Sequence, residues 1–570
     1  MQTQQMTYDV CQRYLRDAQP QMGDLYKVID GYLRSRRIDL LSECSKLFDC
    51  TLYSVDTFRH LRQIEAFFKK NSSFTDDEKC LDTAINSFME NEEQCLNTNR
   101  RLDKFFVERG LDDPDLYKKM SRMERWIEKV LGPFGTFIEG LPLYVRVTSG
   151  ASATLSRRNA QPHLKVRKRI NAPLSSAPYL NALSQYFGYG DIKVRGLNFN
   201  RVEFVPKNWK TYRTIACEPV GSLPLQLAFD TYAKAKLRRV GVDLSDQFRN
   251  QELARLGSTG ERKLSTVDMK AASDTVSFNT VAWLLPEPWF KYLNDIRSPY
   301  YRSDKHGLLG QYAKFSSMGN GATFVLESLI FAAACVASGA KEWSVYGDDI
   351  IIDTDHFEPL MKLMNFLGFV INQEKTFTSG PFRESCGKDW FQGTDVTPFY
   401  LRGWEKRKAA LSHNVNGLAS ISLPGGSLWA YLKDLVSKYK LHFVPYNGVS
   451  TSGVWIDIHS AYTKRLLRNR FWIQTYKAYV AKEATQVCLD SRTLFLWYLD
   501  SSRIGPYNSS TLWVPSFRGS HIKMMPSTTP LVRSRVPTFG HKYVRKWVHW
   551  IPPVTGAPDH LYWWSDYLSA

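Results

Sequence analysis

Tyr346-Gly347-Asp348-Asp349 lies between two short apolar runs, Trp343-Ser344-Val345 and Ile350-Ile351-Ile352. The apolar runs predict two β-strands, and Gly347-Asp348 fits the two-residue link of a tight hairpin with Gly at its first central position. Such a turn places two carboxylates at an exposed tip, where they repel each other unless a cation lies between them. Oxygen ligands of this kind suit a hard divalent cation. The alternative is a solvated acidic turn, and the rest of the chain decides between the two.

The composition indicates a globular protein with a polyanionic partner. The chain has 570 residues, of which 43% are apolar and 14% aromatic, so it can bury a sizeable core. Its formal net charge of +19 favours nucleic acid as the partner, although an anionic membrane would also fit. The longest apolar stretch, 322–337, is too short to span a bilayer comfortably and contains Glu327. The first six residues are polar and lack the apolar core of a signal peptide, so we expect a soluble, unexported protein.

The cysteines give no sign of cross-links. There are nine of them, at irregular spacings and without a Cys-x-x-Cys pair. An odd number without paired spacing argues against both a disulfide framework and a zinc site. Reduced thiols in a cytosol are therefore expected.

The pattern of residues changes along the chain. Residues 1 to 145 predict a mainly helical region, whereas residues 195 to 400 alternate strand-like and helix-like patterns. Between them, a basic run in residues 157–169 fits either a solvated face or an RNA-facing loop. The C-terminal part interleaves basic residues with tryptophans, which suits single-stranded nucleic acid or an aromatic core beneath a basic surface: Arg533, Arg535, Lys542, Arg545, Lys546, Trp547, Trp550, Trp563 and Trp564.

A third carboxylate precedes the acidic turn. Residues 264–267 predict a β-strand that ends at Asp268, and the chain after Ser273 predicts a helix capped by that serine. Functional carboxylates gather at strand ends, so Asp268, Asp348 and Asp349 are expected to surround a pair of metal ions. Two such ions can activate an attacking hydroxyl and stabilise a leaving pyrophosphate.

The loop Ser317-Met318-Gly319-Asn320-Gly321 leads into an apolar helix that is expected from Ala322 onward. Glycines tolerate positive φ, so Gly319 and Gly321 would let the backbone approach a ligand closely. The side chains of Ser317 and Asn320 offer hydrogen bonds that could read a ribose hydroxyl. Taken alone, the motif also fits an ordinary loop before a helix.

Basic residues suited to a triphosphate lie on either side of these motifs. Lys207, Lys210 and Arg213 follow one another at intervals of three. A nucleoside triphosphate needs such a clamp, because its charge must be balanced while it moves into a site that holds metal ions. Further along, Lys375 is a candidate proton donor to the leaving pyrophosphate, and no pattern in the sequence fixes its position.

The ordered set of motifs resembles the palm motifs of viral RNA-dependent RNA polymerases. It is more similar still to the replicase β subunits of the small RNA bacteriophages, the leviviruses typified by phage Qβ. One of these motifs, Phe382 to Gly387, is specific to the phage group. The full set lies within residues 200–400: Val205-Pro206-Lys207-Asn208 through Arg213 to Glu218-Pro219, Val240 to Leu244, Asp268 to Asp274, Ser317 to Gly321, Leu326-Glu327-Ser328, Tyr346 to Asp349, and Phe382 to Gly387.

The resemblance implies an α+β fold of the right-hand type, with fingers, palm and thumb. It implies an antiparallel palm sheet and a largely helical N-terminal region. The segments would be an N-terminal region with the basic loop over 1–195, a fingers segment over 196–253, the catalytic palm over 254–382, and the thumb with the C-terminal region over 383–570. The implied reaction is primer-independent, template-directed RNA synthesis from nucleoside triphosphates.

The resemblance also implies a role for each matched residue. Two magnesium ions would be held by Asp268, Asp348 and Asp349, and Lys375, the candidate proton donor named above, is added to them as the fourth catalytic residue. The nucleotide-binding set would comprise Lys207, Lys210, Arg213, Asp274, Ser317, Gly319 and Asn320. Within that set, Asp274 and Asn320 would check the ribose 2′-hydroxyl.

Lys270 departs from the family pattern, because relatives usually have a small Ser or Ala there. It could lie on the opposite side of the strand end from the metal site and be harmless, or it could tune that site, and we expect the first. The family implies partners as well: the RNA template, the host translation elongation factors Tu and Ts, and a ribosomal small-subunit protein. It implies no membrane and a place in the cytoplasm of the bacterial host.

Two other functions fit parts of the pattern. A reverse transcriptase also has paired aspartates at a hairpin, but such enzymes typically place a bulky aromatic gate against the 2′-hydroxyl, where Asp274 and Asn320 favour ribose. A non-catalytic RNA-binding protein with a decayed polymerase core would use the same basic charge and aromatic ends. The complete set of three carboxylates and the cationic segment favour the polymerase.

Overall fold

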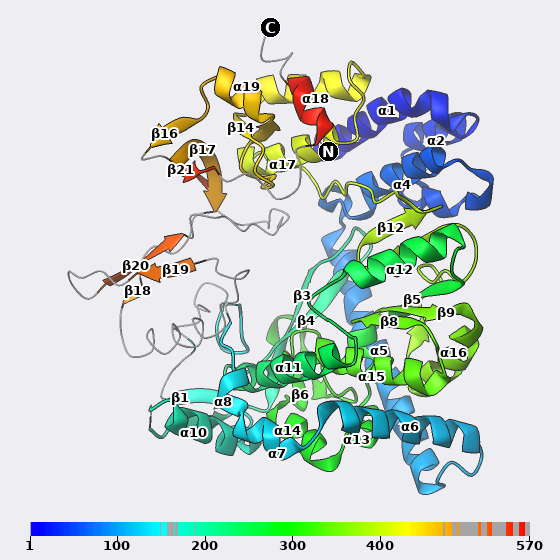
Figure 1. Cartoon of the computed structure of the whole chain (residues 1–570), viewed down its shortest axis with the longest axis vertical. Coiled ribbons are helices and arrows are strands. Elements are labelled where there is room, and N and C mark those ends of the chain that lie inside the picture. The colour runs from blue at the N-terminus through cyan, green and yellow to red at the C-terminus, as the bar shows by residue number, and fades with distance from the viewer. Residues whose placement is uncertain are drawn as a thin grey trace.

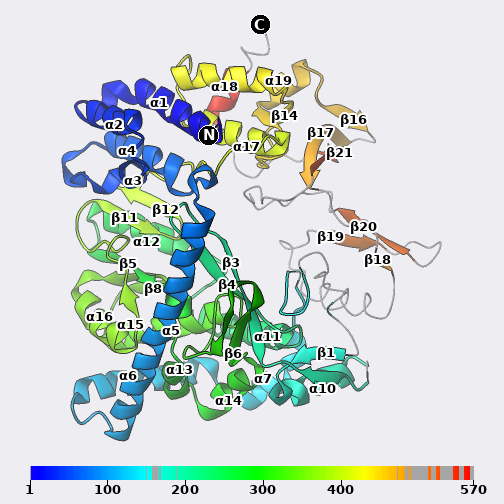
Figure 2. The same cartoon turned by 180° about the vertical axis from the view of Figure 1, so that it is seen from behind.

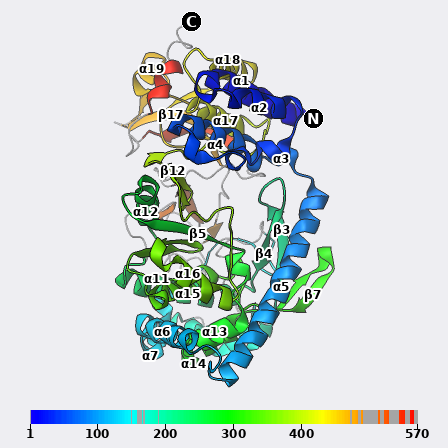
Figure 3. The same ribbon diagram turned by 90° about the vertical axis from the view of Figure 1, so that its right-hand side faces the viewer.

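The computed structural model describes residues 2–148, 150–156, 165, 169–188, 190–470, 473–481, 487–488, 511–514, 521–526, 543–550 and 558–564. Helices and mostly antiparallel sheets are mixed along the chain, which agrees with the expected α+β class. Figure 1 shows the helices α1 (Gln2–Met22), α2 (Leu25–Arg34) and α4 (Val55–Lys69) in one group of elements and the central sheet in a second group. The long helix α5 (Asp77–Val107) runs between the two groups, as Figures 2 and 3 show from two further sides.

The central sheet has four antiparallel strands, in the order β10 (Val370–Ile371), β5 (Leu264–Lys270), β9 (Asp349–Asp353) and β8 (Trp343–Tyr346). β8 and β9 form the expected tight hairpin, in which Tyr346 pairs with Asp349. Residues 350–352 are fully buried, so β9 is covered on both faces. The strand predictions on either side of the acidic turn are confirmed. The predicted strand before Asp268 is also present, and it continues as far as Lys270.

Helices cover both faces of this sheet. Ile350 and Ile352 belong to the core that includes the apolar helix α15 (Thr323–Ser338), and the alternate residue Ile351 belongs to a smaller core with α12 (Phe248–Thr259). Successive side chains of a strand point to opposite faces, so α15 and α12 lie on opposite sides of β9. Other helices of this group include α6 Pro114–Leu131, α7 Phe134–Glu139, α8 Leu141–Tyr144, α11 Ser222–Arg239, α13 Phe278–Leu284, α14 Glu287–Ile296 and α16 Phe357–Phe366.

A second four-stranded sheet carries the cationic segment. Its order is β4 (Tyr212–Cys217), β3 (Phe199–Pro206), β6 (Tyr300–Ser303) and β7 (Leu308–Gln311). β3 and β4 are antiparallel, with Val205 opposite Arg213, and residues 207–211 link them. The three cations of the sequence motif therefore lie at and beside the end of a hairpin.

The N-terminal and C-terminal parts of the chain share one hydrophobic core. Leu61 of α4 and Leu432 of α18 are fully buried in it, and the ring of Trp564 lies 4.4 Å from that of Trp429. The helices of this core are α1 Gln2–Met22, α2 Leu25–Arg34, α3 Ile38–Leu41, α4 Val55–Lys69, α17 Lys408–Ala419, α18 Ser427–Lys438 and α19 Ile458–Thr463. The prediction of a mainly helical region over residues 1–145 is confirmed. The helices of this region divide between two cores, and α6, α7 and α8 contribute to the core of the central sheet.

Short sheets and one more helix complete the described elements: β1 Arg169–Ala172 with β2 Lys193–Gly196, β11 Phe382–Ser385 with β12 Lys388–Phe391 and β13 Thr394–Asp395, β14 Phe443–Pro445 with β15 Val454–Ile456, β16 Arg468–Arg470 with β17 Ile473–Ala481 and β21 Tyr543–His549, β18 Val487–Cys488 with β20 His521–Pro526 and β19 Thr511–Val514, and α10 Ala177–Tyr186. Two of the C-terminal tryptophans differ in exposure. Trp547 is exposed on β21 beside Arg545 and Lys546, whereas Trp564 is buried. Arg533, Arg535 and Lys542 lie outside the described residues.

The basic run is only partly described. Lys165 is buried and donates a hydrogen bond to the carbonyl of Thr148 at 2.7 Å, so this cation serves the local structure. Arg157, Arg158, Arg167 and Lys168 lie outside the described residues. Seven cysteines have a described environment, and all seven are free thiols as expected. Within the described ranges, no helix has both the length and the apolar character needed to cross a membrane.

Candidate active site

The hairpin brings Asp349 against a neighbouring strand. Asp349 is the first residue of β9 and lies directly opposite Asp268 of β5 in the antiparallel register. Directly opposed residues have Cβ atoms about 5 Å apart and point to the same face of the sheet. Asp348, the second residue of the turn, is exposed. The sheet therefore fixes two of the predicted carboxylates opposite each other, and the turn carries the third.

Gly347 allows the turn to lie close to α15. Its φ is 62°, and its amide donates a hydrogen bond to the Ser328 hydroxyl at 3.1 Å. A Cβ at this position would collide with the ring of Phe324, whose Cδ2 atom would be only 3.1 Å away. Any larger residue would therefore push the acidic tip away from the helix that supports it.

Burial and like charge raise pKa values in this cluster. Burial, followed by the charges of Asp348 and Asp268, raises the pKa of Asp349 to about 7. This happens even though the amide of Cys386 donates a hydrogen bond to Asp349 Oδ2 at 3.2 Å. Burial also raises the pKa of Asp268, while Lys375 and a hydrogen bond from Asn372 lower it. The cluster thus holds negative charge that a bound cation would balance.

The donor set fits magnesium, because hard divalent cations prefer carboxylate oxygens. The three carboxylates are not already gathered around one point. Among the residues with a described position, no group of three or more His, Cys, Asp or Glu side chains is close enough to hold a metal ion. Asp268 and Asp349 are set by the sheet register, and Asp348 would have to turn toward them.

Lys375 lies beside Asp268, a position that no pattern in the sequence predicts. Its Nζ is 3.7 Å from Asp268 Oδ1, and Asn372 donates a hydrogen bond to Asp268 Oδ2 at 2.6 Å. Although burial opposes it, the charges of Asp268, Glu384 and Asp349 raise the pKa of Lys375. The structure therefore places a protonated amine at the edge of the carboxylate cluster, as a proton donor requires.

The three predicted cations separate in the structure. Partial desolvation and the charges of Arg213 and Lys375 lower the pKa of Lys207, whereas Asp268 and Asp348 raise it. Lys207 is therefore within electrostatic reach of the carboxylates. Lys210 instead forms an ion pair with Glu43 of the N-terminal region, and its ammonium lies 5.5 Å from the ring centroid of Trp209. Lys207 and Arg213 remain together as a candidate clamp, and Lys210 is engaged elsewhere.

Gly319 makes a close approach, but to another part of the chain. Its φ is 122°, and a Cβ would overlap the carbonyl oxygen of Ala216 in β4. The amide of Ala216 in turn donates a hydrogen bond to the Met318 carbonyl at 2.8 Å. Asn320 Oδ1 accepts a hydrogen bond from the amide of Ala322 at 2.9 Å, and the Ser317 carbonyl accepts one from the Asn320 amide at 3.0 Å. The glycine thus joins the loop to β4, and the Asn320 oxygen is committed to the start of α15.

Asp274 lies in a short turn after β5 and forms an ion pair with Lys314, Nζ to Oδ1 at 2.8 Å. The prediction that Ser273 caps the next helix is wrong. Ser277 is the N-cap of α13 and accepts the Thr280 amide, because the chain makes a 3-10 turn before the helix starts. The Ser273 hydroxyl instead donates to Glu327 Oε2 at 2.7 Å.

Lys270 is an exposed residue at the end of β5. Residues two apart in a strand share a face, so Lys270 lies on the same face as Asp268. The expectation that it lies on the opposite side is therefore wrong. Its exposure lets the ammonium extend into solvent at the rim of the site.

Sequence reasoning missed two further carboxylates near the site. Glu384 of β11 contributes to the pKa values of Asp268, Asp349 and Lys375. Glu327 is buried in α15, and burial together with Asp348 and Asp274 raises its pKa to about 8. Both residues belong to motifs noted in the sequence, but their proximity to the acidic turn depends on tertiary contacts. No pattern in the sequence predicts the buried ion pair between Arg62 and Asp389, which joins α4 to β12.

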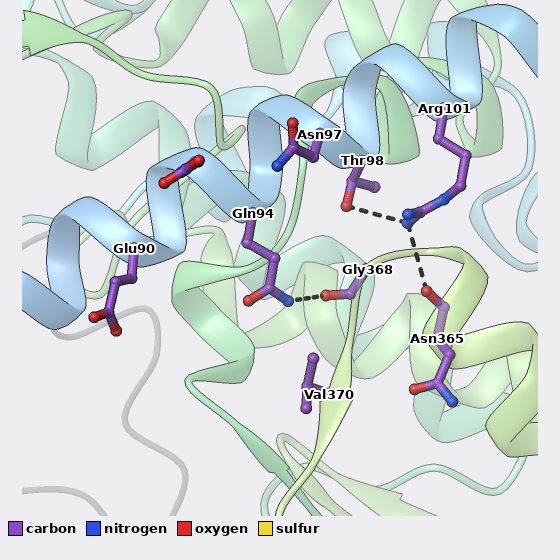
Figure 4. Close-up of a pocket in the computed structure, with 9 residues that line it drawn as sticks. Glu90, Gln94, Asn97, Thr98, Arg101, Asn365, Gly368 and Val370 are labelled. Atoms are coloured by element: carbon purple, nitrogen blue, oxygen red, sulfur yellow. Dashed lines mark hydrogen bonds between the residues drawn. The ribbon is translucent and has the colours of Figure 1, made fainter.

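A cavity of about 390 Å³ lies beside α5, away from the candidate site residues. Figure 4 shows Gln94 donating a hydrogen bond to the Gly368 carbonyl and Arg101 reaching the Asn365 carbonyl across it. The lining also includes Glu90 and Glu93. Acidic side chains do not suit a triphosphate, and none of the predicted site residues contributes to the lining. The cavity therefore marks where α5 attaches to the loop before β10.

Fold and site together define an α+β protein with a carboxylate site on an antiparallel sheet. Residues 29–497 match the family model described as RNA replicase, beta-chain. The chain therefore belongs to the RNA replicase β-chain family, and the resemblance expected from the sequence is confirmed.

Curated relatives agree with this assignment. The RNA-directed RNA polymerase subunit beta of Enterobacteria phage SP is 39% identical over 390 residues, which cover 64% of this chain and 65% of the relative. The corresponding subunit of Escherichia virus Qbeta is 38% identical over 328 residues, covering 56% and 55%. The RNA-directed RNA polymerase beta chain of Escherichia phage MS2 is 35% identical over 303 residues, covering 51% and 54%. The chain thus spans less than two thirds of the length of the curated relatives it matches.

Similarity to solved structures is weaker. The RNA-dependent RNA polymerase of BmCPV, in its in situ structure at elongation state, is 10% identical with a TM-score of 0.38, covering 73% of this chain and 37% of that chain. The RNA-dependent RNA polymerase of a human picorbirnavirus is 13% identical with a TM-score of 0.29, covering 42% of this chain and 55% of that chain.

Proposed function

We propose that this chain is an RNA-directed RNA polymerase that replicates the single-stranded RNA genome of a phage. The reaction would be primer-independent, two-metal nucleotidyl transfer. The observation that carries the proposal is the pairing of Asp268 with Asp349 in the sheet register, with Asp348 at the adjoining turn. Membership of the replicase family and the position of Lys207 near these carboxylates support it.

In this reaction the 3′-hydroxyl of the growing RNA attacks the α-phosphorus of a nucleoside triphosphate, and pyrophosphate leaves. Asp268, Asp348 and Asp349 would hold two magnesium ions, which when bound supply activation of the hydroxyl and charge balance for the phosphates. Lys375 would give a proton to the leaving pyrophosphate. Lys207 and Arg213 would balance the triphosphate charge as it arrives.

The wider expectations follow from the same proposal. Residues 196–253 would form the fingers, 254–382 the palm and 383–570 the thumb with the C-terminal region, after an N-terminal region over 1–195. The protein would act in the cytoplasm of the bacterial host on an RNA template. Its partners there would be elongation factors Tu and Ts and a ribosomal small-subunit protein.

Template-dependent incorporation tests the proposal directly. The protein is supplied with magnesium, a single-stranded RNA and either ribonucleoside or 2′-deoxyribonucleoside triphosphates, with and without elongation factors. Ribonucleotides are expected to be favoured by at least about 100-fold in kcat/KM, because a site that hydrogen-bonds a hydroxyl rejects analogues that lack it. A preference for deoxyribonucleotides would identify a reverse transcriptase instead.

Lys207 and Lys210 provide a matched pair of substitutions. Lys207→Ala is expected to lower kcat/KM for nucleoside triphosphates by roughly 10- to 100-fold, because it removes a cation near the carboxylates. Lys210→Ala is expected to change it by less than about 3-fold, since Lys210 is paired on the surface with Glu43. Steady-state kinetics at fixed magnesium measures both. Equal effects of the two substitutions would contradict the division of the cations described above.

A further inference from the structure

Lys314 is a buried cation next to Asp274. Its side chain has no exposed surface, and its Nζ lies 2.8 Å from Asp274 Oδ1 and 3.2 Å from Glu92 Oε1. The ammonium also lies 4.6 Å from the ring centroid of Phe88 and 5.1 Å from that of Tyr312. Although burial opposes it, the charges of Asp274 and Glu92 raise the pKa of Lys314. A buried lysine needs such partners, because a lone charge inside a protein is strongly disfavoured.

The two ends of this ion pair differ in what can reach them. Asp274 keeps 16% of its side chain exposed, whereas Lys314 keeps none. A ligand can therefore touch the carboxylate but not the ammonium. Any influence of Lys314 on a substrate must pass through Asp274.

The surroundings hold Lys314 in place. Glu92 lies on α5, and its Oε2 accepts a hydrogen bond from the amide of Ala313 at 2.7 Å. Asn99, also on α5, donates to the Ala313 carbonyl at 2.8 Å. The backbone of Lys314 forms a β-bridge with Ser277, the N-cap of α13. The long helix and the turn that bears Asp274 are thus joined at this lysine.

We propose that Lys314 is a positioning residue for sugar selection. Through its ion pair with Asp274, it holds that carboxylate in the orientation that accepts a hydrogen bond from the ribose 2′-hydroxyl. This inference rests on the proposed polymerase function. An ionised carboxylate only accepts hydrogen bonds, so a ribose hydroxyl satisfies it and a 2′-deoxy sugar leaves it unpaired. Without Lys314 the carboxylate is free to turn, and the sugars are distinguished less well.

The test compares kcat/KM for ATP and dATP on one RNA template. The double variant Lys314→Met/Glu92→Gln removes the ammonium and one carboxylate together, so the net charge of the buried group is unchanged. The ATP/dATP ratio is expected to fall at least tenfold, which is part of the roughly 10⁴-fold discrimination that a hydroxyl-binding site can reach. Glu92→Gln alone keeps the pair of Lys314 with Asp274, and its ratio is expected to stay within about twofold of the wild type. A purely structural lysine would lower both rates in parallel and leave the ratio unchanged.

Lys314→Gln is a second variant in case the double variant does not fold, and thermal unfolding is recorded for each protein. Its ratio is also expected to fall, because a neutral amide holds a carboxylate less firmly than an ammonium. Incorporation of ATP with an unchanged ratio in a folded Lys314 variant would overturn the positioning role and leave the proposed polymerase intact. Failure of the wild-type protein to incorporate ATP would overturn the proposed function and this inference with it.

Discussion

Asp348→Asn is expected to lower RNA-directed nucleotide incorporation by at least about 10³-fold, the scale of loss when a group that balances transition-state charge is removed. Asp348 is the exposed residue of the hairpin and has no role in the core, so its neutral replacement should fold normally. It also removes one of the charges that raise the pKa of Asp349, so the free energy of unfolding should stay constant or rise slightly. Loss of activity with unchanged or higher stability is the signature of a functional carboxylate.

Three measurements are needed for this variant: incorporation in magnesium, RNA binding and thermal unfolding. RNA affinity should persist, because the basic residues that attract phosphates are untouched. Asp304→Asn is a suitable control, since Asp304 is 77% exposed and pairs only on the surface with Arg302. Its activity should stay near that of the wild type. If wild-type protein binds RNA but incorporates no nucleotide with its partners and magnesium present, a non-catalytic RNA-binding protein becomes the better account.

The acidic hairpin could be predicted from the sequence because its causes are local. Gly347-Asp348 between two apolar runs specifies both the strands and the turn. The same holds for the strand before Asp268 and for the helices of the N-terminal region. The role of Ser273 was mispredicted, since a 3-10 turn moves the start of the helix to Ser277 and a cap can be identified only when the start is known.

The partners of the site residues could not be predicted, because they come from distant parts of the chain. Lys375 lies next to Asp268 only through the pairing of β10 with β5. Lys210 has the spacing of a clamp residue but forms an ion pair with Glu43 of the N-terminal region. Lys314 is the clearest case, since its place beside Asp274 depends on the β-bridge between Lys314 and Ser277, and its second partner, Glu92, comes from α5. Spacing indicates which chemistry a residue offers, and tertiary contacts decide whether the residue is free to use it.

Gly319→Ala is expected to be among the most damaging single substitutions outside the carboxylates. The positive φ of 122° disfavours any side chain, and a Cβ would overlap the carbonyl oxygen of Ala216. A backbone oxygen cannot turn aside as a flexible side chain can, so the loop and β4 must separate. We expect a loss of roughly 3 to 5 kcal/mol in the free energy of unfolding, or failure to fold. Displacement of Ser317 and Asn320 should also reduce nucleotide incorporation in any protein that does fold.

Gly307→Ala separates the two contributions to this loss. Gly307 also has a positive φ, 65°, but a Cβ there would meet no atom within 4 Å. That substitution should cost only the backbone term, about 1 kcal/mol, and leave incorporation intact. Denaturant unfolding of the two variants side by side measures the difference. Similar stabilities for Gly319→Ala and Gly307→Ala would show that the loop can move off β4 without cost, and the contact between Gly319 and Ala216 would then not be what fixes the loop that carries Asn320.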